Sequence, residues 1–115
     1  MAITALSYIG VNSDKLEDWS DYSQKNLGMQ LVDRGKDILS FRMDDQKQRL
    51  TITGDKGDNL GFMGWEVENK EDLELFATKL EKNNIEVNQG KNSFADKRLV
   101  EDLIYFNDPQ GNRVE

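Results

Sequence analysis

One order of apolar and polar positions occurs twice along the chain. An aromatic residue, an aliphatic residue, a glycine and another apolar residue stand in residues 7–11 and again in residues 61–65. Such short apolar runs are typical of buried strands. Apolar residues at helical spacing follow each run: Leu16, Trp19, Tyr22 and Leu27 in the first half, and Leu73, Phe76, Ala77 and Leu80 in the second. The pattern predicts a strand and then an amphipathic helix in each half.

Residues that start and stop helices flank both helical segments. In the first half Ser13 or Asp14 is placed to cap the helix, and Gly28 is placed to end it. In the second half Asn83 and Asn84 stand at the end. The spacing of Trp19 with its apolar neighbours predicts that it packs the helix onto the sheet.

Three further strands follow each helix. They are predicted at residues 29–32, 37–41 and 48–52, and again at 85–87, 102–106 and 112–115. The offset between the halves drifts, which indicates a longer loop at residues 89–97 and a structural repeat without a strict period. We therefore predict an α+β fold of two repeated βαβββ modules with curved mixed sheets. The modules cover about residues 1–54 and 59–115 of a single domain, residues 1–115.

Composition narrows the functional classes. The 115 residues are 37% hydrophobic and 32% charged, with no long apolar run and no basic, apolar leader. A cytoplasmic protein is expected. The net charge of -7 and the scattering of fifteen basic residues among twenty-two acidic ones disfavour nucleic-acid binding. Lys97 and Arg98 could contact an anionic substrate, but a solvated loop is the favoured interpretation.

Histidine and cysteine are both absent from the sequence. The chain therefore lacks the commonest general base, the commonest transition-metal ligand and any thiolate. A Ser-His-Asp triad cannot be assembled, and a two-histidine, one-carboxylate iron site cannot be built from this chain alone. The sequence predicts no catalytic residue.

Three segments resemble one known superfamily. Residues 6–11 through Trp19, residues 61–67, and the turn from Asp108 to Asn112 are similar to the vicinal oxygen chelate (glyoxalase/bleomycin resistance/dioxygenase) superfamily. More narrowly, they look like the N-terminal domain of type I extradiol dioxygenases of the 2,3-dihydroxybiphenyl 1,2-dioxygenase group. The similarity covers nearly the whole chain and implies the glyoxalase-like fold.

The resemblance also implies where metal ligands would stand. The superfamily places them on the first strand of each module and near the end of the last strand, and here these positions hold Tyr8, Phe62 and Glu115. Phenylalanine and neutral tyrosine do not replace two imidazoles, and one carboxylate holds iron weakly. We expect degenerate ligand positions and no metal or cofactor bound by this chain.

The function implied by the resemblance is that of a non-catalytic N-terminal domain. The parent protein would be an Fe(II)-dependent extradiol dioxygenase of aromatic hydrocarbon catabolism, which cleaves the ring of catechol-type molecules. Its C-terminal catalytic domain, in the same polypeptide, would hold Fe(II) through two histidines and a glutamate. This chain alone is expected to be inactive, with that domain as its partner and a homo-oligomer as a further option.

The alternative is a free-standing, metal-free module of the glyoxalase/bleomycin-resistance kind that binds a small organic ligand as a dimer. Its candidate ligand-gripping aromatics are Tyr8, Phe62, Trp65 and Tyr105. A core position for all four is favoured, because truncating a buried aromatic to alanine costs about 3–5 kcal/mol. The sequence alone leaves the substrate and the choice between pocket and core open.

Overall fold

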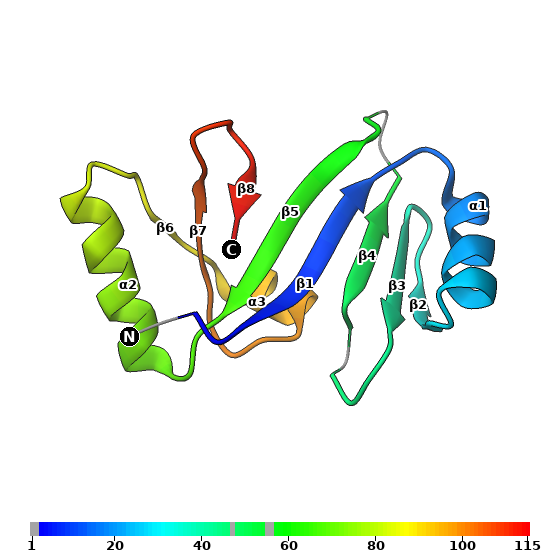
Figure 1. Cartoon of the computed structure of the whole chain (residues 1–115), viewed down its shortest axis with the longest axis horizontal. Coiled ribbons are helices and arrows are strands. Elements are labelled where there is room, and N and C mark those ends of the chain that lie inside the picture. Colours follow the sequence, from blue (N-terminus) through cyan, green and yellow to red (C-terminus); the bar gives the residue numbers. More distant parts are fainter. Residues whose placement is uncertain (1–2, 47, 55–56) are drawn as a thin grey trace. The chain divides into compact units, whose positions relative to one another are not determined.

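The computed structural model describes residues 3–46, 48–54 and 57–115, and Figure 1 shows their helices and strands. The chain divides into two compact units. One consists of Tyr8–Gly61, and the other of Met1–Ser7 together with Phe62–Glu115. The boundaries fall inside two strands, β1 (Ala5–Asn12) and β5 (Asn59–Glu66). Each unit contains strands and helices of its own.

The unit of residues 8–61 has the strand order β2-β3-β4-β1. After β1 come α1 (Leu16–Asp21), a π-helical turn (Tyr22–Asn26), β2 (Gln30–Arg34), β3 (Ile38–Arg42) and β4 (Leu50–Thr53). β1 and β4 run parallel, whereas β2, β3 and β4 are antiparallel neighbours. The predicted βαβββ order of the first half is confirmed.

Leu39, Phe41 and Ile52 form the core of this unit and are almost completely buried. Leu39 and Phe41 alternate along β3, and Leu39 pairs with Ile52 on β4, so all three side chains leave the same face of the sheet. Trp19 packs against this cluster. Its predicted role of joining helix to sheet is confirmed.

The first helical segment ends as predicted but begins differently. Gly28 has a φ of +69°, a left-handed conformation that glycine adopts without strain. The Ser13 Oγ accepts a hydrogen bond from the backbone N–H of Lys15 at 3.1 Å, but α1 itself has no side-chain cap. The prediction that Ser13 or Asp14 caps the helix is wrong, because the serine closes the turn before it.

The second unit has the strand order β5-β8-β7-β6. After β5 come α2 (Lys70–Lys82), β6 (Asn88–Gln89), α3 (Asn92–Arg98), β7 (Ile104–Asn107) and β8 (Arg113–Val114). β5 and β8 run parallel, and the other pairs are antiparallel. This unit repeats the βαβββ order with α3 inserted, so the α+β fold of two such modules is confirmed. Within the described ranges, no helix is long and apolar enough to cross a membrane.

The end of α2 explains why one predicted strand is misplaced. Asn84 adopts a positive φ of 63°, and the next N–H, that of Ile85, donates to the carbonyl of Leu80 at 3.0 Å. Ile85 therefore belongs to the helix termination. The predicted strand at residues 85–87 is wrong, and pairing begins only at Asn88.

The predicted loop at residues 89–97 is also wrong, because it contains most of α3. Ala95, which lies within this short helix, is buried. Before the helix, a Cβ on Gly90 would lie 2.4 Å from Leu103 Cδ1 and 2.9 Å from the Leu103 carbonyl oxygen. The segment is held by such close tertiary packing, and its sequence carries no apolar stripe that would have predicted a helix.

Asp108 organises the turn that leads into β8. Its Oδ1 accepts hydrogen bonds from the N–H groups of Gln110 (2.9 Å) and Asn112 (2.8 Å), and its Oδ2 accepts one from Asn112 Nδ2 (3.0 Å). Gly111 completes the turn with a φ of +86°. The side-chain hydrogen bond from Asn112, and then the backbone N–H groups, hold the pKa of Asp108 below its ordinary value of 3.8.

Asp108→Ala should destabilise the chain in a pH-dependent way. Because the folded-state pKa lies below the unfolded value, the stabilisation is fully present above the unfolded pKa and is lost as the pH falls through the folded pKa. Urea unfolding should therefore show a larger loss at about pH 7 than at about pH 2. Asp14→Ala, an exposed control, should show little change at either pH. Equal losses for Asp108→Ala at both pH values would contradict this account.

Candidate functional site

Two of the three predicted ligand positions lie on neighbouring strands of the second unit. Phe62 on β5 is opposite Arg113 on β8. Glu115 directly follows β8, and its N–H donates to the carbonyl of Met63 at 2.8 Å. Glu115 and Arg113 alternate along the strand, so their side chains leave the face of the sheet on which Phe62 lies. Tyr8, the third position, lies on β1 in the other unit and is buried.

The carboxylate of Glu115 is held by two arginines. Its side chain is 0% exposed, and its Oε1 accepts from Arg98 Nε at 2.8 Å. Its Oε2 accepts from Arg98 Nη2 at 3.1 Å and from Arg113 Nε at 2.8 Å. Arg98 thus makes a two-pronged contact with both carboxylate oxygens, which is the strongest geometry for an arginine–carboxylate pair.

Each of the two guanidinium groups also lies over an aromatic ring. The Arg98 Cζ is 3.7 Å from the centroid of the Phe62 ring, and the Arg113 Cζ is 4.0 Å from that of Tyr105. A cation over a ring face is attracted by the ring quadrupole, most strongly where water is excluded. The two arginines are therefore fixed from both sides, by the carboxylate of Glu115 and by an aromatic ring.

This arrangement opposes a metal ion at Glu115. Three N–H groups use lone pairs that a metal would need, and the guanidinium groups already supply positive charge. Among the described residues, no three histidine, cysteine, aspartate or glutamate side chains gather into a metal site. Phe62 provides no ligand atom in any case. That the chain binds no metal stays a prediction.

The prediction that Arg98 lies in a solvated loop is wrong. Arg98 is the last residue of α3, and its side chain is only 14% exposed. We call Glu115, Arg98 and Arg113 the Glu115 cluster. The sequence contains one usable signal for it, since the alternating residues 113 and 115 carry opposite charges on one face of a strand. Nothing in the sequence indicates Arg98, which lies seventeen residues before Glu115.

The four aromatic candidates do not share one environment. Tyr8 and Phe62 are buried, as expected of core residues. Trp65 is 41% exposed, so a core position is wrong for it. Tyr105 is half-buried and lines a cavity.

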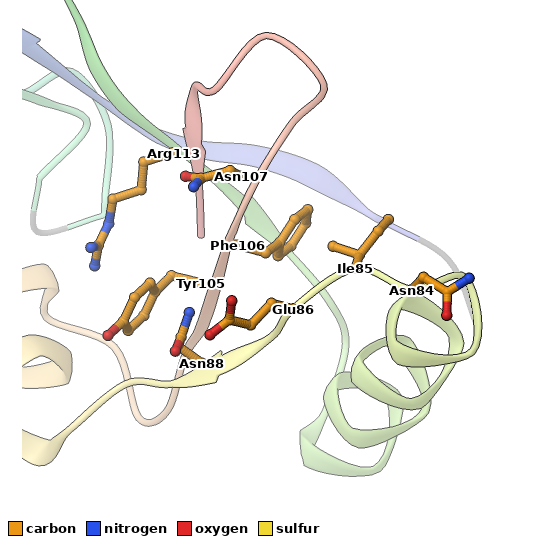
Figure 2. A pocket seen from close by; sticks show the side chains of 8 residues that line it. All are labelled: Asn84, Ile85, Glu86, Asn88, Tyr105, Phe106, Asn107 and Arg113. Atoms are coloured by element: carbon orange, nitrogen blue, oxygen red, sulfur yellow. The ribbon is translucent and has the colours of Figure 1, made fainter.

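The cavity beside Tyr105 has a volume of about 460 Å³ and is shown in Figure 2. It is bordered by the end of α2, the segment leading into β6, and strands β6, β7 and β8. Its lining residues are Asn84, Ile85, Glu86, Asn88, Tyr105, Phe106, Asn107 and Arg113. A second hollow, beside α2, measures only about 40 Å³, room for little more than a water molecule. Only the first has the size of a small-molecule site.

Comparison with known proteins gives consistent matches. A family model described as the dihydroxybiphenyl dioxygenase BphC D1 domain matches residues 6–54. The whole chain is 31% identical over 116 residues to a biphenyl-2,3-diol 1,2-dioxygenase of Sphingomonas paucimobilis, and 33% identical over 117 residues to an iron-dependent extradiol dioxygenase of Rhodococcus jostii. The chain spans 39% of the length of each of these relatives.

Solved structures agree. A crystal structure of a catechol 2,3-dioxygenase superposes with a TM-score of 0.94 at 32% identity, and the match covers 99% of this chain and 40% of that one.

The repeated βαβββ units, with a glutamate at the end of the second, define a protein of the vicinal oxygen chelate class. Within that class the chain matches the N-terminal domain of the extradiol dioxygenases. Both levels of the resemblance found in the sequence are confirmed.

Glu115→Gln should destabilise the chain by about 3 kcal/mol, because it leaves two largely buried guanidinium groups without their counter-charge. The free energy of unfolding from urea titration measures the effect. Glu17→Gln is the matched control, since Glu17 pairs with Arg34 but its side chain is 76% exposed. The control should change stability by no more than ~0.5 kcal/mol. Similar losses in both variants would show that the Glu115 cluster is no stronger than a surface pair.

Proposed function

We propose that this chain is the non-catalytic N-terminal domain of an Fe(II)-dependent extradiol dioxygenase. The observation that carries the proposal is the match of the whole chain to 39% of the length of such enzymes. The hydrogen bonds from two arginines to Glu115 agree with this proposal. Of the three expected ligand positions, Glu115 alone holds a residue of ligand type, and these bonds give it a structural role.

The catalytic chemistry would belong to a following C-terminal domain of the same polypeptide. Two histidines and a glutamate of that domain would hold Fe(II), which supplies the dioxygen chemistry. The substrate class is a catechol-type aromatic such as 2,3-dihydroxybiphenyl, and both atoms of dioxygen would enter the ring-opened product next to the diol. Residues 1–115 would support and wall that domain, and the location of such an enzyme would be the cytoplasm.

The test is ring cleavage by the complete gene product, compared with the 115-residue chain. With Fe(II) and 2,3-dihydroxybiphenyl, we expect the complete protein to consume dioxygen as the catechol disappears. The 115-residue chain should stay at the rate of buffer with iron, because it carries no histidine. Treatment with a chelator should abolish the activity of the complete protein. Persistent inactivity across a range of catechols, or cleavage by the short chain, would refute the proposal.

The polar cavity beside Tyr105 favours a second candidate, a free-standing, metal-free module that binds a small organic ligand as a dimer. The reading frame after codon 115 separates the two candidates. A stop codon would favour the small module. Codons for two histidines and a later glutamate at the ligand positions of a further module pair would favour the dioxygenase.

A further inference from the structure

We infer that the cavity beside Tyr105 is a binding site for a small organic acid that carries a hydroxyl group. Its volume of about 460 Å³ falls within the range of small-molecule sites. Tyr8, Phe62 and Glu115 do not line it, so it is distinct from the degenerate ligand positions. The inference holds whether or not the parent protein is a dioxygenase.

Strand register gathers the polar lining on one side of the sheet. Asn88 on β6 pairs with Tyr105 on β7, and Asn107 on β7 pairs with Arg113 on β8. Tyr105 and Asn107 alternate along β7, so all four side chains leave the same face. Figure 2 shows the carboxylate of Glu86 on the side of Asn88. The cavity therefore has hydrogen-bonding groups from three adjacent strands and the segment before β6.

Arg113 is positioned before any ligand arrives. Its Nε donates to the fully buried Glu115 carboxylate at 2.8 Å, and its guanidinium lies 4.0 Å from the centroid of the Tyr105 ring. Its side chain is 30% exposed. An arginine held in this way loses little conformational entropy on binding, which favours affinity. Its planar fork of N–H groups suits a carboxylate.

The two charged groups of the lining specify the rest of the ligand. Arg113 offers only donors, whereas the carboxylate of Glu86 offers only acceptors. A ligand that contacts both groups needs an acceptor such as a carboxylate at one end and a donor such as a hydroxyl elsewhere. The amides of Asn88 and Asn107 can serve either group, and the Tyr105 ring provides an aromatic wall.

The anion 3-hydroxybenzoate combines these features and serves as the probe, with 3-hydroxybenzamide as the analogue that lacks the charge and benzoate as the analogue that lacks the hydroxyl. Titration of the ¹⁵N-labelled 115-residue chain, followed by NMR, should show saturable shifts at the amides of Asn88, Tyr105 and Asn107. The carboxylate probe 3-hydroxybenzoate should bind about tenfold more tightly than 3-hydroxybenzamide, a difference of ~1.4 kcal/mol. Absence of saturable binding, or equal binding of 3-hydroxybenzoate and 3-hydroxybenzamide, would overturn the inference.

Two charge variants locate the site without removing any residue of the Glu115 cluster. Asn107→Asp adds a negative charge to the cavity wall beside Arg113 and should weaken the binding of 3-hydroxybenzoate about tenfold. Gln110→Glu adds the same charge to the same hairpin outside the cavity and should leave affinity unchanged. Both positions are exposed, so both variants should fold. Unchanged affinity in Asn107→Asp, or an equal loss in the two variants, would refute the assignment.

Discussion

The buried carboxylate of Glu115 joins parts of the second unit that have little stability of their own. α3 has seven residues and β8 has two, and an isolated helix of that length does not persist in water. Burying a carboxylate costs several kcal/mol unless its charge and lone pairs are satisfied. Arg98 from α3 and Arg113 from β8 meet both needs. One residue therefore makes the placement of the short helix and the last strand mutually dependent.

The same contact lies on one of two faces of the sheet that differ in chemistry. On β7 and β8, Phe106 and Val114 point toward α2, where the Phe76 and Phe106 rings lie 6.5 Å apart. The alternate residues, among them Tyr105 and Arg113, point the other way. Arg113 is held on that face, because its Nε donates to Glu115 and its guanidinium lies over the ring of Tyr105. The buried ion pair thus fixes one residue of the wall of the cavity in Figure 2.

How far the sequence predicts the structure depends on where the stabilising contacts come from. The sequence predicts the strands that contain Tyr8 and Phe62 and the helix that contains Trp19. In these segments the spacing of the apolar residues follows from which positions face the core. The sequence does not predict β6 and α3, because their positions depend on a helix end at Ile85 and on a partner distant in sequence. The local pattern suffices for Arg113 and Glu115, which alternate on one strand. It fails for Arg98, whose role arises only from folding.

The hydrogen bonds of Arg98 and Arg113 to Glu115 also show how a buried carboxylate can be stabilised without a metal ion. With Phe62 and Tyr8 at the positions where the resemblance implies imidazoles, a metal at Glu115 would have one protein ligand and little affinity. The glutamate would then be a buried anion without a partner, which is more costly than no glutamate at all. Two guanidinium groups resolve this by providing positive charge and directed donors at the carboxylate. A ligand-type residue in this fold therefore indicates a requirement for a positive partner, which an arginine can meet as well as a metal.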